Sequence, residues 1–319
     1  MPASLEYLER CAAETGHSVI AMEKVTRLGE IAGEIGRHPT LRGALVLKGG
    51  TAINLCAGPP PRMSVDLDFN FVGCADRAEM VQARPTIEKA ILDLVRRLGY
   101  EVQQSAEAAA SRKIYARYRS VLGPGDRIEL DINYLWRTPL AGVRGAELWQ
   151  PGELDRPSIT VVSDEELWIG KLLAFLDRTA PRDAWDVSRM PSIASALPRS
   201  PRLRRWFVAM SFILDHPLPT YDRNRLGTRL SPDAVETQLH PMLTGDDRPD
   251  AAELLRDAWR VAEPLMALTA REATFVERAQ QADLDARLIF DDDDEAQRFA
   301  SHPQVTWKLH NLRRHLGRA

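Results

Sequence analysis

The chain has 319 residues, of which 44% are hydrophobic and 27% charged, and its formal net charge is −3. These values are ordinary for a globular protein of one or two domains, and the charge does not indicate a surface that is basic throughout. No run approaches the roughly 20 apolar residues that span a bilayer, the N-terminus lacks the regions of a signal peptide, and the three cysteines form no CxxC pair. We therefore expect a cytoplasmic protein without a membrane partner.

The first elements are two helices and a strand–turn–helix–strand unit. Residues 3–37 predict two helical pieces that are broken near Gly16, because apolar residues of the second piece recur with a period close to 3.6. Residues 45–71 then predict a short apolar strand, a double-glycine turn, a helix start, a proline-rich loop and a second strand. We expect the rest of the first domain to be organised around this unit.

The second strand of this unit carries Asp66 and Asp68 one residue apart. Side chains at i and i+2 of a strand point to one face, so both carboxylates lie together while Val65, Leu67 and Phe69 face the core. Two adjacent carboxylates repel each other unless a cation binds between them, and Mg²⁺ prefers one or two carboxylates together with substrate phosphates. The pair is therefore a candidate site for Mg²⁺ or Mn²⁺. The alternative is the polar side of an edge strand in water.

The glycine turn before this strand suits phosphate binding. Gly49 and Gly50 allow the backbone to approach phosphate oxygens, and the helix start with Thr51 adds N–H donors and a favourable dipole. The turn is not a Walker A loop, because Lys48 precedes the glycines. Ser64 is expected to share the strand face of the aspartates, where its hydroxyl can touch a phosphate or a metal-bound water. The alternatives are a plain tight turn and an ordinary serine at the start of a strand.

A helix and three strand-like runs follow. One apolar stripe predicts the helix over 76–98, and Gly-Pro-Gly at 123–125 predicts a hairpin turn between the last two runs. The third run alternates apolar residues with Glu129, Asp131 and Asn133, so Asp131 is expected to supply a third carboxylate from a neighbouring strand. The three runs cover residues 100–105, 112–121 and 127–136.

The character of the chain changes after a polar loop at 138–157 and a short strand at 159–162. Nearly everything after Ser163 reads as helical with breaks at prolines, and the acidic run at 291–295 reads as a solvated loop. The expected domains are an α/β domain at 1–157, which includes the N-terminal helices, and a helical domain at 158–319.

The first helix of the second domain carries a cationic face. At 100° per residue, Lys171 and Arg178 fall in one arc with the small Gly170, which suits a face turned to an anionic ligand. The next helix carries Arg182 and Asp186, which are i and i+4 and so belong either to the same site or to a surface ion pair. Nucleotidyl transfer needs a cation held by carboxylates, a backbone close to the phosphates, and a Lys or Arg for developing charge. The chain offers candidates for all three.

Three blocks occur in a fixed order: Lys48-Gly-Gly-Thr-Ala52, Arg62-x-Ser-x-Asp-x-Asp-Phe69 and Lys171…Arg178…Arg182-Asp-x-x-Asp186. Together they resemble the AbiEii family of nucleotidyltransferase-like toxins of type IV toxin–antitoxin systems, which includes the mycobacterial MenT toxins. The first two blocks are shared with the wider DNA polymerase β-like nucleotidyltransferase fold, and the third is the specific part. The ending Trp307-Lys-Leu-His-Asn311 is also similar, so the resemblance spans about residue 20 to the end.

The resemblance implies an α+β fold, in which a DNA polymerase β-like nucleotidyltransferase lobe with a mixed sheet precedes a mostly helical C-terminal lobe, with the active site between them. It implies NTP as cosubstrate, Mg²⁺, and transfer of a nucleoside monophosphate to an acceptor. In the MenT members the acceptor is the 3′ end of tRNA, and its modification blocks aminoacylation and translation. A cognate antitoxin neutralises such toxins and in some systems phosphorylates the serine of the second block, here Ser64.

The first two blocks and the strand after them imply one set of roles. Asp66 and Asp68 bind the Mg²⁺ that bridges the triphosphate, and Asp131 is the candidate that activates the acceptor hydroxyl. The C-terminal tail after Glu295, which contains no acidic residue, and a basic strand face are expected to guide a nucleic-acid acceptor. That face consists of Arg112, Lys113, Arg117 and Arg119.

The third block implies the phosphate-side roles. Lys171 and Arg182 neutralise phosphate charge, and Asp186 either orients Lys171 or acts as a base. We expect Lys171→Ala and Asp66→Ala each to abolish transfer without unfolding the protein. The remaining residues expected to bind the nucleotide are Lys48, Gly49, Gly50, Thr51, Ser64 and Arg178.

Two other functions stay open. One keeps the enzyme class and changes the acceptor to a small molecule or a protein. The other is a non-catalytic regulator that binds NTP and a partner.

Overall fold

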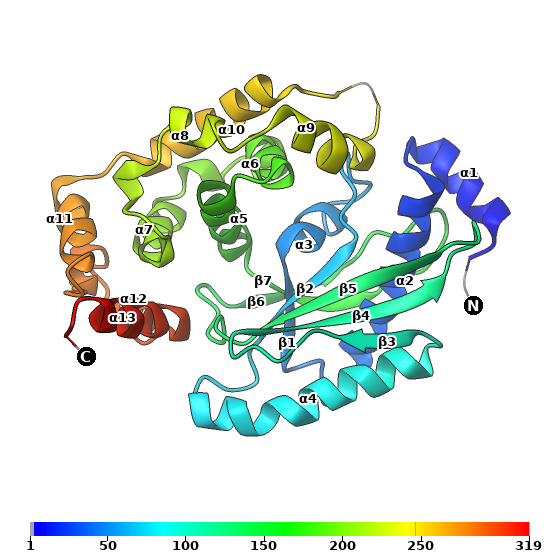
Figure 1. The fold of residues 1–319 in the computed structure, drawn as a ribbon, viewed down its shortest axis with the longest axis horizontal. Coiled ribbons are helices and arrows are strands. Elements are labelled where there is room, and N and C mark those ends of the chain that lie inside the picture. The colour runs from blue at the N-terminus through cyan, green and yellow to red at the C-terminus, as the bar shows by residue number, and fades with distance from the viewer. Residues whose placement is uncertain (1–2, 246, 319) are drawn as a thin grey trace. The chain divides into compact units, whose positions relative to one another are not determined.

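The computed structural model describes residues 3–245 and 247–318, which form two compact units (Figure 1). The first unit comprises the residues up to Ser163 together with Met242–Asp247. The second comprises Asp164–Pro241 and the residues from Arg248 onward. The strand at Ser158–Val162 thus belongs with the first unit, whereas the expected domains began the helical part at 158.

Two helices begin the first unit, as the apolar period predicted. They are α1 (Leu5–Thr15) and α2 (Val19–Arg37), and the prediction of a break near Gly16 is confirmed. Gly16 ends α1 with φ +74°, a conformation that glycine adopts without a steric penalty. Ser18 then caps α2 by accepting a hydrogen bond from the backbone N–H of Ala21.

A seven-stranded mixed sheet forms the centre of the first unit, in the order β3-β4-β5-β2-β1-β7-β6. β1 pairs antiparallel with β2, whereas β2 with β5 and β1 with β7 are parallel. The mixed sheet followed by helices confirms the predicted α+β fold class. The strands are β1 (Leu45–Lys48), β2 (Asp66–Phe71), β3 (Glu101–Gln104), β4 (Ser111–Arg119), β5 (Gly125–Asn133), β6 (Val143–Glu147) and β7 (Ser158–Val162).

Strand β6 lies inside the segment 138–157, which the sequence predicted as a loop, so that prediction is wrong over these five residues. Every β6 residue is exposed or half-buried, and the strand pairs with β7 at the edge of the sheet. A strand without a buried face has no alternating apolar pattern from which it can be recognised.

The two faces of the sheet differ in polarity. Leu67 lies opposite Leu130 and Phe69 opposite Ile132, and all four side chains are buried. Helices α2 and α4 (Arg77–Arg97) pack on this side of the unit; in Figure 1, α4 runs alongside β3. The opposite face therefore carries the polar residues of each strand, including the predicted aspartates.

Helices make up the second unit, whose longest members are α10 (Ala251–Met266), α5 (Asp164–Arg178), α6 (Pro181–Ile193) and α13 (Pro303–His315). α6 packs against both α5 and α10. The other α-helices are α7 (Pro201–Met210), α8 (Arg223–Gly227), α9 (Pro232–Ala234), α11 (Ala270–Ala279) and α12 (Asp293–Ala300), and short turns of other helix types cover Leu197–Arg199, Ser211–Ile213, Leu218–Thr220, Val235–Leu239, His240–Met242 and Ala286–Leu288. α3 (Gly49–Leu55) belongs to the first unit.

The acidic run at 291–295 begins a helix instead of forming the expected loop. Asp292 caps α12 by accepting a hydrogen bond from the N–H of Glu295, and the next three residues are acids in the first turn. Negative side chains are stabilised there by the helix dipole. Across residues 3–245 and 247–318, no helix combines the length and apolarity that crossing a bilayer requires.

Candidate active site

The double-glycine turn joins β1 to α3 and lies against the side chains before and within β2. Gly49 has φ +76°, and a Cβ atom at this position would lie 2.4 Å from Oδ2 of Asp68. A Cβ on Gly50 would lie 2.9 Å from Oγ of Ser64. Both positions therefore need glycine for a close approach, and Gly49 needs it also for its positive φ. The turn thus leaves backbone atoms beside the Asp68 carboxylate.

Four carboxylates occupy the polar face of two neighbouring strands. Asp66 of β2 lies opposite Glu129 of β5, and Asp68 lies opposite Asp131. Because these residues alternate with buried apolar ones on both strands, their side chains share one face. The structure thus brings together the three aspartates that the sequence singled out and adds Glu129, which the alternation of the third run placed on the polar face without assigning it to the site.

Two lysines flank this group along one cross-strand row. Lys48 lies opposite Asp68, and Lys113 of β4 lies opposite Asp131 with its Nζ 3.7 Å from Oδ2. Lys113 also forms an ion pair with Glu129. Burial raises the pKa of Asp131, and the negative charge of Asp68 raises it further. The positive charges of Lys113 and Lys48 lower it.

The carboxylates fit a divalent cation that takes most of its ligands from water and phosphate. Within the described part of the chain, no three His, Cys, Asp or Glu side chains converge into a closed metal cage. Mg²⁺ does not require one, because it binds through one or two carboxylates and keeps other oxygen ligands. Asp68 and Asp131 offer such a pair, and across residues 3–245 and 247–318 the buried Oδ1 of Asp131 has no hydrogen-bond partner.

Asp131→Asn should raise the melting temperature near neutral pH, because the ionised carboxyl destabilises the fold. Its pKa is higher in the folded chain than the usual value of about 3.9, so ionising it lowers stability as the pH rises through the folded value. Below the usual value the group is protonated in both states, and the gain should vanish. Thermal melts between about pH 3 and pH 8 measure this. Glu129→Gln, which loses its Lys113 partner, should show no such gain, and a lower melting temperature of Asp131→Asn at pH 7 would contradict the assignment.

Ser64 lies before the second strand, not within it as the sequence predicted. β2 begins at Asp66, and the Ser64 side chain is buried against the glycine turn. Its Oγ is 3.0 Å from Oγ1 of Thr51, and Thr51 donates a hydrogen bond of 2.5 Å to the backbone carbonyl of Asp66. Thr51 and Ser64 therefore hold the glycine turn to the start of β2.

A short segment from later in the chain fixes the loop in front of β2. The backbone N–H of Met63 donates to the carbonyl of Met242 at 2.8 Å, and the N–H of Thr244 donates to the carbonyl of Pro61 at 3.0 Å. Arg62 is 2% exposed. No local pattern predicted this return of the chain, because the two segments lie far apart in the sequence.

In the second unit, Lys171 is enclosed by two aspartates. Its Nζ, on α5, lies 2.9 Å from Oδ1 of Asp183 and 2.9 Å from Oδ2 of Asp186, both on α6. The lysine is 8% exposed and each aspartate 1%. The sequence predicted Lys171 on a helix face turned to an anionic ligand, whereas in the structure its ammonium contacts these two carboxylates. Asp186 has the contact that it needs to orient Lys171.

Asp183 belongs to the third block, but the sequence interpretation gave it no role. Arg178 donates to it from Nε at 2.6 Å and from Nη2 at 3.1 Å. Although burial acts to raise it, the charges of Lys171 and Arg178 lower the pKa of Asp183 to about 2. Its position in the third block, five residues after Arg178, was the sequence feature that could have indicated its place in the site. Arg182, next to it, is half-buried.

The corner between α5 and α6 holds a strained residue. Thr179 has φ +52°, which is a genuine outlier for a β-branched side chain. Its buried Oγ1 has no hydrogen-bond partner within residues 3–245 and 247–318. This corner places Asp183 within reach of both Lys171 and Arg178. The ion-pair group, which consists of Lys171, Arg178, Asp183 and Asp186, is therefore held at a cost in backbone energy.

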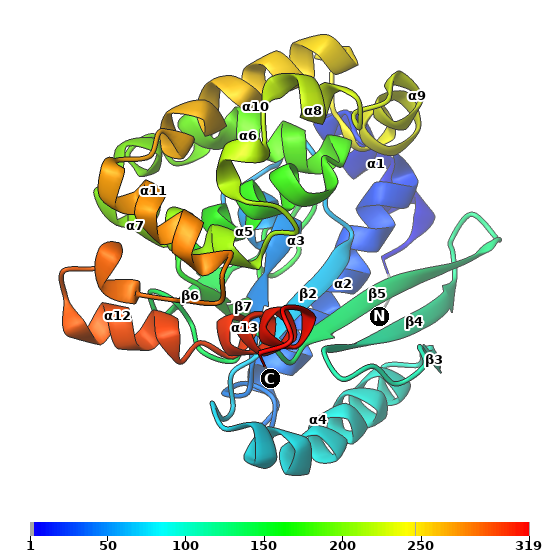
Figure 2. The ribbon, with the colours of Figure 1, turned by 60° about the vertical axis from the view of Figure 1, so that its left-hand side comes forward.

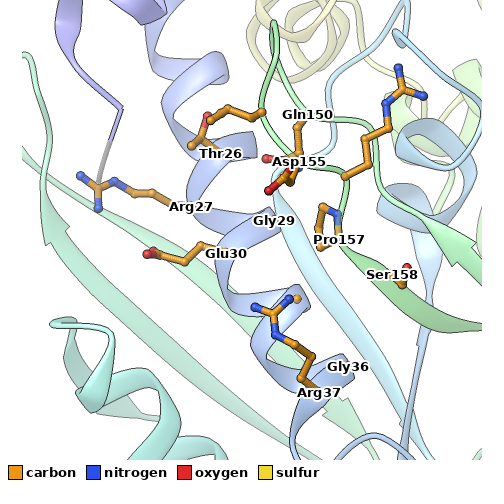
Figure 3. Close-up of a pocket in the computed structure, with 13 residues that line it drawn as sticks. Thr26, Arg27, Gly29, Glu30, Gly36, Arg37, Gln150, Asp155, Pro157 and Ser158 are labelled. Carbon is orange, nitrogen blue, oxygen red and sulfur yellow. The ribbon is translucent and has the colours of Figure 1, made fainter.

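A cavity of about 560 Å³ lies elsewhere in the first unit, between α2 and the segment 150–158 (Figure 3). α2 presents glycines there because the segment packs closely: a Cβ on Gly29 would lie 2.3 Å from Nε2 of Gln150, and one on Gly36 would lie 2.4 Å from the carbonyl of Ser158. None of the predicted site residues lines this cavity. We therefore place the candidate chemistry at the carboxylate face and the ion-pair group.

Comparisons with known proteins agree with the family resemblance. The family described as "Nucleotidyl transferase AbiEii toxin, Type IV TA system" matches residues 36–302. Among solved structures, the chain is similar to MenT4, a nucleotidyltransferase toxin from Mycobacterium tuberculosis H37Rv, with 20% sequence identity, a TM-score of 0.56, and coverage of 97% of this chain and 99% of that one. A search of curated protein sequences found no significant match.

Proposed function

Because the chain belongs to the AbiEii family of nucleotidyltransferase toxins of type IV toxin–antitoxin systems, we propose that it transfers a nucleoside monophosphate from an NTP to the 3′ end of tRNA and so blocks translation. The observation that carries the enzymatic part is the cross-strand row of Lys48, Asp68, Asp131 and Lys113 beside the glycine turn. Carboxylates next to a close-approaching backbone are what nucleotidyl transfer requires of a protein.

At the carboxylate face, each residue has a role that its position supports. Asp68 and Asp131 would hold Mg²⁺, and Asp66 adds a negative charge on the same strand face. The ion, when bound, neutralises the triphosphate and polarises the reacting phosphorus. The backbone at Gly49 and Gly50 binds phosphate oxygens. Asp131 accepts the proton of the acceptor hydroxyl, a role that its place opposite Asp68 and its Oδ1, which has no hydrogen-bond partner within residues 3–245 and 247–318, both support.

In the second unit, the exposure of each cationic side chain decides the role that we propose for it. Arg178, whose side chain is 64% exposed, and the half-buried Arg182 neutralise phosphate charge. Lys171 is buried between Asp183 and Asp186 and acts as a positioning residue for this group. This assignment differs from the expectation that Lys171 contacts phosphate directly.

A cognate antitoxin follows from the family, and we propose Ser64 as the residue that it controls by phosphorylation. A phosphate brings about −1.5 to −2 charges and three oxygens, which do not fit beside Gly50 and Thr51 unless the turn moves. Because Ser64 is 8% exposed, the modification requires local opening. Mass spectrometry of the chain co-expressed with its antitoxin should locate phosphate on Ser64. An inactivated chain without that modification would remove the residue from this role.

Incubating the pure protein with each labelled NTP and total tRNA tests the proposed function. We expect label on tRNA, sensitive to removal of divalent cations, and no label with Asp66→Asn. Label only on protein or on a small molecule would move the chain to the other acceptors. Absence of any transfer, with equal growth of cells that express the wild type or Asp66→Asn, would favour the regulator instead.

A further inference from the structure

The polar face of the sheet continues beyond the carboxylates along the β4–β5 hairpin, which Figure 2 shows as two long adjacent strands. Moving along the hairpin from the row of Asp131 and Lys113, the next row pairs Glu129 with Tyr115. The row after it pairs Arg127 with Arg117, and the last pairs Gly125 with Arg119. Residues two apart on a strand share a face and are about 6.5 Å apart, so the arginines begin about 13 Å from Asp131.

The residues at this end of the face are not the same as those of the basic strand face that the sequence predicted. Arg112 points to the other side of the sheet, where its Nε donates to Glu88 at 3.0 Å, and Lys113 is paired with Glu129 and Asp131. The residues left to bind an anion are the three exposed arginines and the tyrosine between them and the carboxylates. We call this set the arginine track: Tyr115, Arg117, Arg119 and Arg127.

The charges around the arginine track favour an anionic ligand. Across residues 3–245 and 247–318, Arg117, Arg119 and Arg127 form no ion pair. The acid that faces them on β3 is Glu101, opposite Arg117, and Arg117 lies 3.5 Å from the side-chain oxygen of Gln103. The guanidinium of Arg127 lies 4.6 Å from the centroid of the Tyr115 ring, and both are planar groups of the kind on which unpaired bases stack.

We propose that the arginine track binds the single-stranded 3′ end of a polynucleotide acceptor and leads its terminal hydroxyl to Asp131. This inference rests on the proposed function and names the surface that the acceptor uses. Arginine binds phosphate through two parallel hydrogen bonds, and aromatic and guanidinium planes stack with unpaired bases. This face of the sheet carries arginines at one end and carboxylates at the other. The arginines attract the phosphates of the polynucleotide, and its terminal hydroxyl reaches the carboxylates and their cation. This arrangement sets the direction in which the polynucleotide lies along the face.

A triple variant, Arg117→Gln with Arg119→Gln and Arg127→Gln, tests the arginine track. The matched control changes three exposed arginines elsewhere in the same unit, Arg42→Gln with Arg77→Gln and Arg97→Gln, and so alters the net charge equally. We expect the track variant to lose about 100-fold or more in kcat/KM for tRNA labelling, while its affinity for NTP is unchanged. In titrations with tRNA, the slope of log Kd against log salt should fall by about 2, since each single-strand phosphate contact contributes about 0.7. The control should change neither value.

Failure of the inference and failure of the proposed function give different results. If the wild type labels tRNA and the track variant labels it equally, with the same salt slope, the inference is overturned and the proposed function stands. If the wild type labels no tRNA, the proposed acceptor is wrong, and the titration alone decides the track: weaker binding by the track variant supports it, and equal binding overturns it. Loss of antitoxin binding with unchanged tRNA binding would assign this face to the protein partner and overturn the inference.

Discussion

Asp68→Asn should reduce nucleotidyl transfer by about 10³-fold or more while the protein stays folded. The carboxylate lies in the row with Asp131 and beside Gly49, so its charge is available to a cation that bridges substrate phosphates. Asparagine keeps the shape that fills the space next to Gly49 and removes the charge. Transfer from labelled NTP measures the loss, and a circular-dichroism melt within a few degrees of the wild type shows that the fold is kept.

Glu129→Gln is the matched control for this substitution. Glu129 is on the same face of the neighbouring strand, but its carboxylate is already paired with Lys113. We expect it to change transfer far less than Asp68→Asn does. Equal losses in both variants would indicate a general effect of negative charge on this face, and full activity of Asp68→Asn would remove the residue from cation binding.

Lys171→Ala should destabilise the second unit by about 3–5 kcal/mol, the cost of removing one partner from a buried ion pair. Its ammonium lies 2.9 Å from each of two carboxylates that are 1% exposed, and alanine would take this charge away from both. The structure thus changes the expectation from sequence that the variant loses activity without unfolding. Urea denaturation monitored by circular dichroism measures the loss.

Arg178→Ala is the control for Lys171→Ala, because it also contacts Asp183 but from a side chain that is 64% exposed. Water can replace most of its interaction, so we expect a clearly smaller loss of stability than for Lys171→Ala. An inactive Lys171→Ala variant with the stability of the wild type would restore direct phosphate contact by Lys171. An active variant with reduced stability would confine the lysine to a structural role.

Acid should unfold the second unit partly through Asp183. Its folded pKa of about 2 is depressed below the unfolded value, so its contribution is present above about pH 4 and is lost as the pH falls toward 2. This sign is opposite to that of Asp131, whose ionised form destabilises the folded chain. The two aspartates show that a carboxylate's neighbours, and not its residue type, decide its effect on stability.

The sequence by itself determined the local features of this protein. A 3.6 period and Gly16 located the first two helices, and strand alternation put Asp66 and Asp68 on one face with Leu67 and Phe69 buried. These features follow from backbone geometry over a few residues, for which pattern alone is sufficient. The family resemblance was also confirmed, and the residues that match the family include all three blocks.

Only the tertiary structure decided which of these residues meet. Alternation predicted the face of Asp131, but the parallel register of β5 with β2 places it opposite Asp68 and not Asp66. Helical periodicity put Lys171 on an apparent ligand face, yet packing of α6 against α5 buries it between two aspartates. The exposed strand β6 exists because β7 offers a partner. Strand register, ion pairing and burial depend on residues far apart in the chain, and local sequence patterns carry no record of those contacts.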